Sequence, residues 1–318
     1  MQGKETRRRI RKASAALLPK EAGQSSGSPG MELSPEPRSH AKADRSMMTR
    51  ESTGERSPVA LGASSDPMCE AHFSSTLRRL AQKNRCPSLQ ITERHRAAIF
   101  DWVVEVMAVY EQRDTTLFRC AALIDRFYAQ NPSISPSDIH LTGAAAIAMA
   151  SKLDNVKYIR LGVIQENICQ GKFSKEEIAT RETELFKAND FRVAQPTQIE
   201  LLATALALLP LDASQRAFVS NSATMILRMC LFTREMSSEC SPAELTGLAI
   251  ILGLKIMGQI LPDPKIGDFV QIVARKFELA GPLFFPKLQA LHQFTVDFES
   301  IVPQAKNLRH YNSFSKAL

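Results

Sequence analysis

Hydrophobic and polar residues follow a helical spacing from residue 69 to about residue 302. Apolar side chains recur at three- and four-residue steps, the period of a helix that buries one face, and no segment shows the alternation of a half-buried strand. The clearest stripe consists of Arg96, Ile99, Phe100, Val103, Val106 and Met107. The pattern therefore predicts an all-α protein.

The opposite side of this helix carries a second set of large residues. Trp102, the only tryptophan of the chain, lies there with Ala98, Glu105 and Val109. An amphipathic helix is expected to turn that side toward water. The placement of Trp102 predicts a contact surface for a partner.

Capping residues mark the starts of several helices. Ser135–Asp138 and Ser241–Glu244 each offer a serine N-cap, a proline at the first helical position and an acid two residues later. Ser174 with Glu177, and Thr197 with Glu200, have capping-box spacing. We expect a helix to begin at each of these four places.

An internal repeat divides the helical region. Residues 141–145 and 245–249 share four of five positions at an offset of 104. Glycine inside a helix costs about 1 kcal/mol relative to alanine, so Gly143 and Gly247 predict close helix approach at equivalent places. We therefore expect two tandem helical repeats that meet near Pro196.

The repeats define four expected regions. The first, 1–68, is rich in Ser, Pro, Gly and charged residues and is expected to be disordered. An N-terminal helix over Cys69–Gln82 joins the first repeat to make 69–195. The second repeat covers 196–302, and 303–318 forms a C-terminal tail.

The charge of the chain is concentrated in the N-terminal region. Residues 1–20 hold seven basic residues against one acid, nearly the whole net charge of +7. The cluster Arg7–Lys12 is typical of a nuclear-import signal or a weak phosphate-binding arm, and it is equally consistent with a solvated charge run. We expect the protein in nucleus and cytoplasm. Serines precede prolines in the same region, either as sites for a proline-directed kinase or by composition, at Ser28, Ser34 and Ser57.

No pattern of catalytic or metal-binding residues is found in the sequence. The six cysteines are widely spaced without a C-x-x-C pair, and the histidines form no H-E-x-x-H motif. A Gly-rich phosphate loop is also missing, so we expect neither an enzyme nor a bound cofactor or metal. The longest apolar run, Gly247–Leu254, is too short to cross a bilayer, and no membrane association is expected.

Several short segments resemble the cyclin box in order and spacing. They are His95–Val106, Leu123–Phe127, Leu141–Ala145, Ala150–Asp154, Phe173–Glu177 and Asp190–Val193. Cyclins are marked by five separated residue types, which here are Arg96, Asp125, Leu141, Lys152 and Glu182. The resemblance implies the double cyclin fold, with five helices in each repeat, and Asp101, Trp102 and Glu105 favour the A/B type.

Lys152 and Glu182 are the candidate kinase-binding pair. From spacing alone, a solvated salt bridge is the favoured interpretation. The resemblance implies instead that they hydrogen-bond the regulatory helix of a cyclin-dependent Ser/Thr protein kinase. The expected contact surface also includes Met149, Leu153, Asp154, Phe186, Phe191 and Val193.

Arg96 and Asp125 are expected to be structural. An arginine at the head of an apolar stripe must be paired if it is buried, and a carboxylate suits bidentate pairing. Leu141, Gly143 and Gly247 are assigned to the same structural group.

The resemblance to A/B-type cyclins also implies a groove for Arg-x-Leu motifs of substrates or inhibitors. The candidate residues are His95, Ala98, Ile99, Trp102, Glu105, Ile139 and His140. His95, Ala98 and His140 depart from the usual residues, and the loss of apolar walls should weaken such a groove by about 1 to 3 kcal/mol. Core packing of Trp102 is the alternative.

The leading hypothesis is a regulatory cyclin that binds and activates a cell-cycle kinase. An adaptor of the TFIIB type, which binds DNA and polymerase, would explain the positive charge, but a zinc ribbon is missing and the excess charge lies in the N-terminal region. A helical scaffold without a kinase is a third possibility.

Overall fold

The computed structural model describes residues 66–81, 91–131, 134–261, 263–279 and 281–308, and these residues form helices and connecting turns without a strand. The all-α prediction is confirmed. The predicted disorder of the N-terminal region and the basic segment Arg7–Lys12 fall almost entirely outside the described residues. Asp66 caps the helix that follows, so residues 66–68 belong to the folded part.

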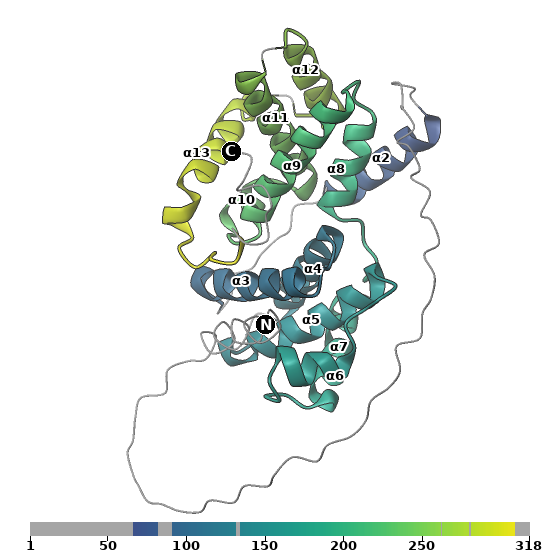
Figure 1. The fold of residues 1–318 in the computed structure, drawn as a ribbon, viewed down its shortest axis with the longest axis vertical. Helices are drawn as coiled ribbons and strands as arrows, with labels where there is room; N and C mark the ends of the chain where they lie inside the picture. Colours follow the sequence, from purple (N-terminus) through teal and green to yellow (C-terminus); the bar gives the residue numbers. More distant parts are fainter. Residues whose placement is uncertain (1–65, 82–90, 132–133, 262, 280, 309–318) are drawn as a thin grey trace, which may run out of the picture. The chain divides into compact units, whose positions relative to one another are not determined.

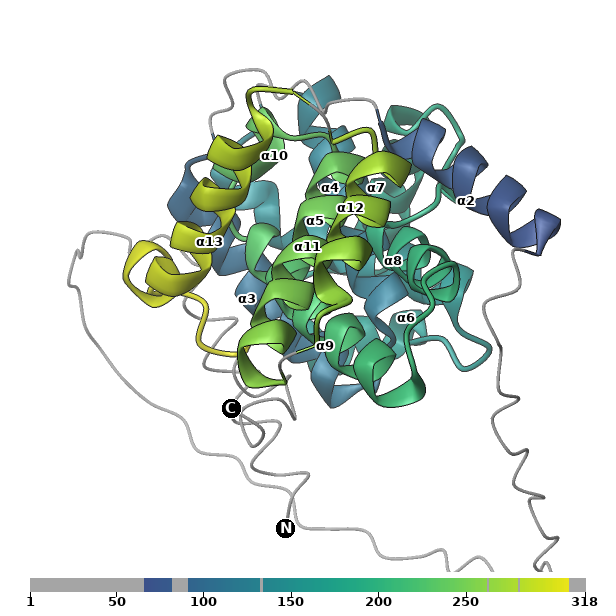
Figure 2. The same ribbon diagram turned by 90° about the horizontal axis from the view of Figure 1, so that it is seen from above.

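The first group of helices precedes residue 196. It contains α2 (Pro67–Leu80), α3 (Glu93–Val109), α4 (Asp114–Gln130), α5 (Ile139–Asp154), α6 (Leu161–Val163), a π-helical turn at Ile164–Ile168 and α7 (Lys175–Ala188). The N-terminal helix therefore lies at 67–80 rather than 69–82. It packs against α8 (Gln198–Ala207) of the second group, as Figures 1 and 2 show.

The second group is built around one apolar helix. It contains α8, α9 (Ala213–Cys230), α10 (Glu235–Glu239), α11 (Pro242–Ile260), α12 (Ile266–Lys276) and α13 (Phe284–Ile301). α11 is long and apolar enough to span a membrane by length and composition, yet 67% of it is buried within the protein. α8, α9, α12 and α13 pack against it, so it serves as a core helix (Figure 2).

Capping decides where most of these helices begin. Full capping boxes form at Ser174, Thr197 and Ser241, as predicted. The fourth expected cap is wrong: Pro136–Asp138 forms a 3₁₀ turn, and α5 begins after it without a side-chain cap. The Ser135 hydroxyl accepts instead from Ser137, because the turn places Ser137 within reach.

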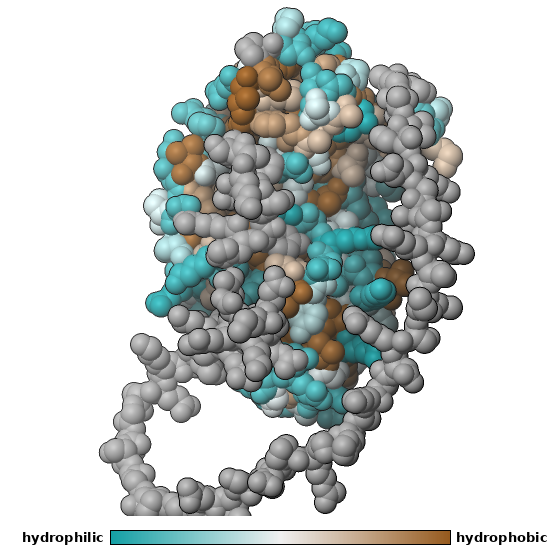
Figure 3. Space-filling view, in the orientation of Figure 1, coloured by the Kyte–Doolittle hydropathy of each residue, from teal (hydrophilic) through white to brown (hydrophobic). Residues whose placement is uncertain are grey.

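The C-terminal segment is partly anchored. Residues 303–308 carry the buried Ala305 and Leu308, and the Asn307 backbone N–H donates to Asp101 Oδ1 over 2.7 Å. The predicted tail at 303–318 thus begins with an ordered contact to α3, and residues 309–318 lie outside the described part. On the face shown in Figure 3, hydrophobic side chains occur in separate patches among hydrophilic ones.

Candidate protein-docking surface

Lys152 and Glu182 meet at the surface, on two helices that pack against each other. Lys152 lies in the last turn of α5, and Glu182 lies on α7, whose start is fixed by the Ser174 capping box. Lys152 Nζ is 2.8 Å from Glu182 Oε1 and 2.9 Å from Oε2. The lysine side chain is 43% exposed and the glutamate 15%, so a partner can reach the lysine. Such a pair adds only about 0 to 1 kcal/mol to stability.

Apolar side chains are exposed on the same two helices and the segment that follows α7. Leu153, Phe186 and Phe191 are 41%, 37% and 65% exposed. The two phenyl rings meet edge to face at 5.1 Å. Met149 and Val193, which the sequence analysis grouped with them, are buried and belong to the core. An ion pair with exposed apolar neighbours is typical of a protein-docking surface.

Two exposed apolar residues were missed by the sequence analysis. Val156 is fully exposed and Tyr158 is 51% exposed, in the segment that follows α5. This segment is anchored by Asn155, whose side chain donates to Gln112 and Thr116, and by the Ile159 N–H, which donates to a serine hydroxyl on α5. The sequence signal that could have identified Val156 and Tyr158 is that these large apolar residues lie outside any helical stripe.

Asp154 is not part of this exposed surface. Its carboxylate accepts from Arg119 Nε at 2.8 Å, and its side chain is only 9% exposed. Arg119 also donates to the Gln195 carbonyl at 2.6 Å. Burial raises the pKa of Asp154, while the charge of Arg119 opposes that shift. Asp154 therefore ties α5 to α4 and to the linker instead of facing a partner.

The expectation that Trp102 faces water is wrong. The side chain is 1% exposed, and its ring meets His140 edge to face at 4.5 Å. Gly143 leaves room for it, because a Cβ at that glycine would lie 3.0 Å from the indole Cζ3. On the other side of α3, Phe100 lies 6.5 Å from Phe232 of the second group. α3 is packed on both faces, so neither face is a solvent face.

The remaining residues of the predicted Arg-x-Leu groove are mostly buried too. Ile99, Glu105, Ile139 and His140 are between 1% and 6% exposed, whereas His95 and Ala98 are half-buried. Burial, with a contribution from Lys172, lowers the pKa of His140 to about 4, so its imidazole is neutral near pH 7. The exposed tryptophan that the groove hypothesis needs is not present at this surface.

Arg96 and Asp125 form the expected pair. Both guanidinium Nη atoms donate to the Asp125 carboxylate, and Nε donates to the Leu231 carbonyl at 3.0 Å. Arg96 also lies over the Phe100 ring at 4.7 Å, and its side chain is 7% exposed. Leu141 packs half-buried against the core. The contact with Leu231, 135 residues away, could not be predicted from the sequence.

Within the described residues, no group of three His, Cys, Asp or Glu side chains is placed to hold a metal ion. The arrangement supports binding to another protein.

Comparison with known proteins finds a matching domain family and a similar fold. The protein-family model of the cyclin N-terminal domain matches residues 69–194 of this chain. The chain is 25% identical over 168 residues to G2/mitotic-specific cyclin-B2 of Gallus gallus, covering 53% of this chain and 40% of that protein. It is 21% identical over 224 residues to G2/mitotic-specific cyclin-B of Patella vulgata, covering 70% and 52%. The chain thus spans about half the length of these relatives.

A solved structure shows the same fold. The viral cyclin of herpesvirus saimiri matches with a TM-score of 0.54 at 14% identity, over 76% of this chain and 99% of that one. At this identity the likeness concerns the fold alone.

Proposed function

We propose that the chain is a regulatory cyclin that binds a cyclin-dependent Ser/Thr protein kinase and activates it allosterically. The match of residues 69–194 to the cyclin N-terminal domain and the cyclin-B relatives support this proposal. The observation that carries the proposal is the Lys152–Glu182 pair with its exposed apolar neighbours Leu153, Phe186 and Phe191. The resemblance to cyclins implies that Lys152 and Glu182 match the lysine and glutamate that contact the kinase, and the apolar residues lie next to them. The protein acts as a regulatory subunit and is not itself an enzyme.

The mechanism is a shift of the kinase's conformational equilibrium. The Lys152–Glu182 pair and the exposed apolar side chains contact the regulatory helix of the kinase in its inward position. In that position the helix glutamate pairs with the catalytic lysine. Because this surface binds only the active arrangement, the binding free energy shifts the kinase toward it.

We further propose a role in cell-cycle control with A/B-type character, in nucleus and cytoplasm. Two observations support this proposal. The B-type relatives are named as G2/mitotic-specific cyclins, and Asp101, Trp102 and Glu105 are residues that resemble the A/B type. The burial of Trp102 argues against docking of Arg-x-Leu motifs on α3.

Capture from cell extract tests the binding step. The tagged full chain should retain a Ser/Thr protein kinase that is identified by mass spectrometry, and Lys152→Ala with Glu182→Ala should weaken its capture by about 30-fold or more, as expected for loss of central interface residues. The matched control is Lys276→Ala with Glu70→Ala, which removes another Lys–Glu pair of 2.7 Å. Equal capture by both double variants would contradict the proposal.

The TFIIB-type alternative predicts a different result in the same preparation. A DNA-binding adaptor should bind duplex DNA with an affinity that falls steeply as salt rises. The proposed regulatory subunit should retain the kinase at salt concentrations that abolish any DNA binding.

A further inference from the structure

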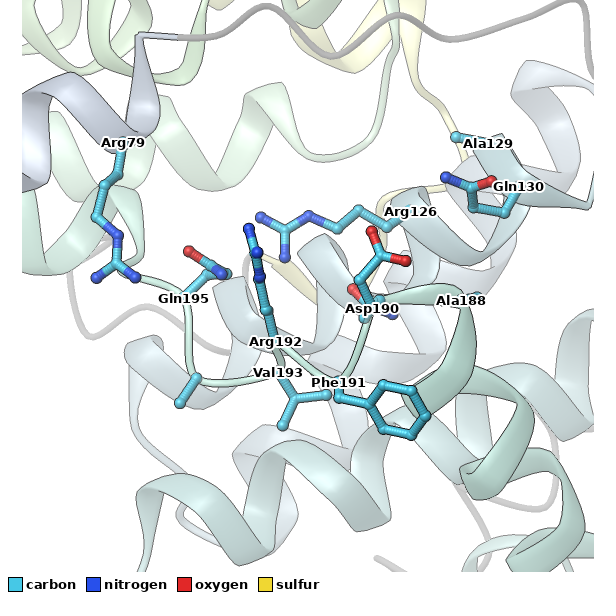
Figure 4. A pocket seen from close by; sticks show the side chains of 12 residues that line it. Arg79, Arg126, Ala129, Gln130, Ala188, Asp190, Phe191, Arg192, Val193 and Gln195 are labelled. Atoms are coloured by element: carbon cyan, nitrogen blue, oxygen red, sulfur yellow. The ribbon is translucent and has the colours of Figure 1, made fainter.

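A pocket of about 710 Å³ lies where α2, α4 and the linker between α7 and α8 meet. Figure 4 shows the side chains that line it. α2 supplies Arg79, α4 supplies Arg126 and the linker supplies Arg192. Asp190 is the only acidic residue among the lining residues. The pocket therefore carries three positive charges and one negative charge.

None of the three guanidinium groups forms an ion pair in the part of the chain that the structure describes. No carboxylate there lies within 4.0 Å of any of them, unlike Arg96, whose partner is Asp125. In Figure 4 the Arg126 and Arg192 groups point toward each other, and Arg79 extends from α2 on the other side of Gln195. Like charges gathered in this way repel one another unless an anion joins them.

Burial adds to the cost of this arrangement. Burial lowers the pKa of Arg126, although the charge of Asp125 opposes the shift. Asp125 already accepts both Nη groups of Arg96, so it does not neutralise the pocket. A bound anion would compensate the charge that the protein leaves uncompensated.

In the linker, Arg192 directly follows two residues with an unusual backbone conformation. Asp190 and Phe191 are consecutive non-glycine residues with φ of 49° and 57°. The backbone of an L-residue with a side chain rarely adopts this left-handed conformation. Such a conformation persists where surrounding contacts impose it. The Arg192 N–H donates to the Asn189 carbonyl at 2.8 Å, and the buried Asn189 side chain donates to Leu185 at 2.8 Å. The strained turn thus fixes where the Arg192 side chain starts.

We propose that this pocket binds the phosphate of a phosphoserine or phosphothreonine in a partner protein. Guanidinium forks match phosphate oxygens in paired hydrogen bonds, and three of them around one pocket suit a single dianionic group. Phe191, 65% exposed at the rim, offers an apolar contact to the neighbouring peptide residues. A nucleic acid presents many phosphates and requires an extended basic surface, which this single cluster does not provide. Phosphate binding does not require that the partner is a kinase, although Phe191 also lies on the proposed kinase-binding surface.

Fluorescence anisotropy with the full chain tests the proposal. The probe is a labelled peptide library with a fixed phosphoserine between degenerate positions, compared with the same library carrying serine. The phosphorylated library should bind at least about 10-fold more tightly, as expected for charge-assisted bonds. Arg79→Gln with Arg192→Gln, both at exposed positions, should remove that preference, whereas Arg275→Gln on α12 should not.

Three results would overturn the proposal. They are equal binding of the two libraries, an unchanged preference in the double variant whose circular dichroism is native, and tighter binding of single-stranded RNA than of the phosphorylated library. Displacement of the bound library by inorganic phosphate at millimolar concentration would support it, because the site recognises the phosphate itself.

Discussion

The side chain of Arg96 contacts both repeats. Its guanidinium group pairs with Asp125 within the first repeat and donates to the Leu231 carbonyl in the second. The Asp125 carboxylate and the Leu231 carbonyl together stabilise the positive charge of Arg96, whose side chain is 7% exposed. Removal of the carboxylate would leave that buried charge without its counter-ion, which is costly in the protein interior.

Asp125→Ala should therefore lower the free energy of unfolding by about 3 kcal/mol. Urea denaturation monitored by circular dichroism measures the change. Asp268→Ala, an exposed acid on α12, is the control and should change stability by less than about 1 kcal/mol. If the two variants have the same midpoint, the pair is not structural.

Asp101 gives the anchored C-terminal segment a dependence on pH. Burial raises the pKa of its carboxyl to about 6 from 3.8, while the hydrogen bonds from Asn307 oppose the shift. An acid with a raised folded pKa stabilises the fold fully below the unfolded pKa, and that contribution is lost as pH rises from about 4 to 6.

Asp101→Asn should remove this dependence, because an amide can still accept from the Asn307 N–H and does not titrate. The free energy of unfolding of the wild type minus that of the variant should decrease as the pH rises from about 4 to about 6. Above about pH 7 this difference should be constant. Unfolding titrations at several pH values provide the comparison, and a difference that rises with pH would show that the sign is wrong.

One residue role could be predicted from the sequence because pairing is obligatory there. The Arg96–Asp125 pair followed from the cost of an unpaired buried arginine. Trp102 was misplaced because periodicity assumes that one side of a helix faces water, whereas α3 packs on both sides. Long-range partners such as Asp101 with Asn307 have no signal in local sequence.

At the scale of elements, Gly143 and Gly247 allow close packing at equivalent positions of the two repeats. A Cβ at Gly143 would lie 2.6 Å from Ile99 Cδ1, and one at Gly247 would lie 2.8 Å from the Phe277 ring. The predicted close approach of a helix is found at Gly143, whereas the close neighbours of Gly247 are side chains that follow α12, those of Phe277 and Leu279. α5 and α11 can therefore lie close to the side chains of neighbouring segments.

Gly143→Ala and Gly247→Ala should each destabilise the protein by about 1 to 3 kcal/mol through overpacking. Gly267 in α12 is a matched control, because a Cβ there would meet open space. Gly267→Ala should be neutral or stabilising by up to about 1 kcal/mol, since alanine favours the helix. Thermal unfolding ranks the three variants, and equal effects at all three positions would contradict the packing argument.

Helix starts were predictable where a capping box is complete. Ser174, Thr197 and Ser241 each have a glutamate three residues on that reaches back to the cap. Ser135 is followed at that spacing by Asp138, and a 3₁₀ turn forms there instead. An aspartate side chain is one carbon shorter than glutamate, so the reciprocal bond of a capping box is harder to close.

At the scale of the whole molecule, charged side chains join the two repeats. Arg228 on α9 contacts Asp114 on α4 at 2.7 Å, and Arg234 contacts Glu93 on α3 at 2.6 Å. Together with Arg96 and Asn307, these contacts connect residues more than 100 positions apart. The described residues belong to one compact unit, although the sequence suggested two domains whose boundary stays a prediction.

The repeats should therefore unfold together. Trp102 fluorescence reports on the first repeat alone, and far-ultraviolet circular dichroism reports on both. The two signals should change at the same urea concentration in a single transition. Two separated transitions would show that each repeat is stable without the contacts between them.

Activation of a kinase is the central claim, and the specific activity of the captured kinase tests it most directly. The kinase identified by capture is purified without a partner and assayed on a peptide substrate with equal amounts of each chain, at a concentration just sufficient to saturate it with the wild type. The wild type and the control double variant, Lys276→Ala with Glu70→Ala, should raise its activity equally. Lys152→Ala with Glu182→Ala should leave it near the basal level while its circular dichroism stays native. Full activation by that double variant would contradict the account.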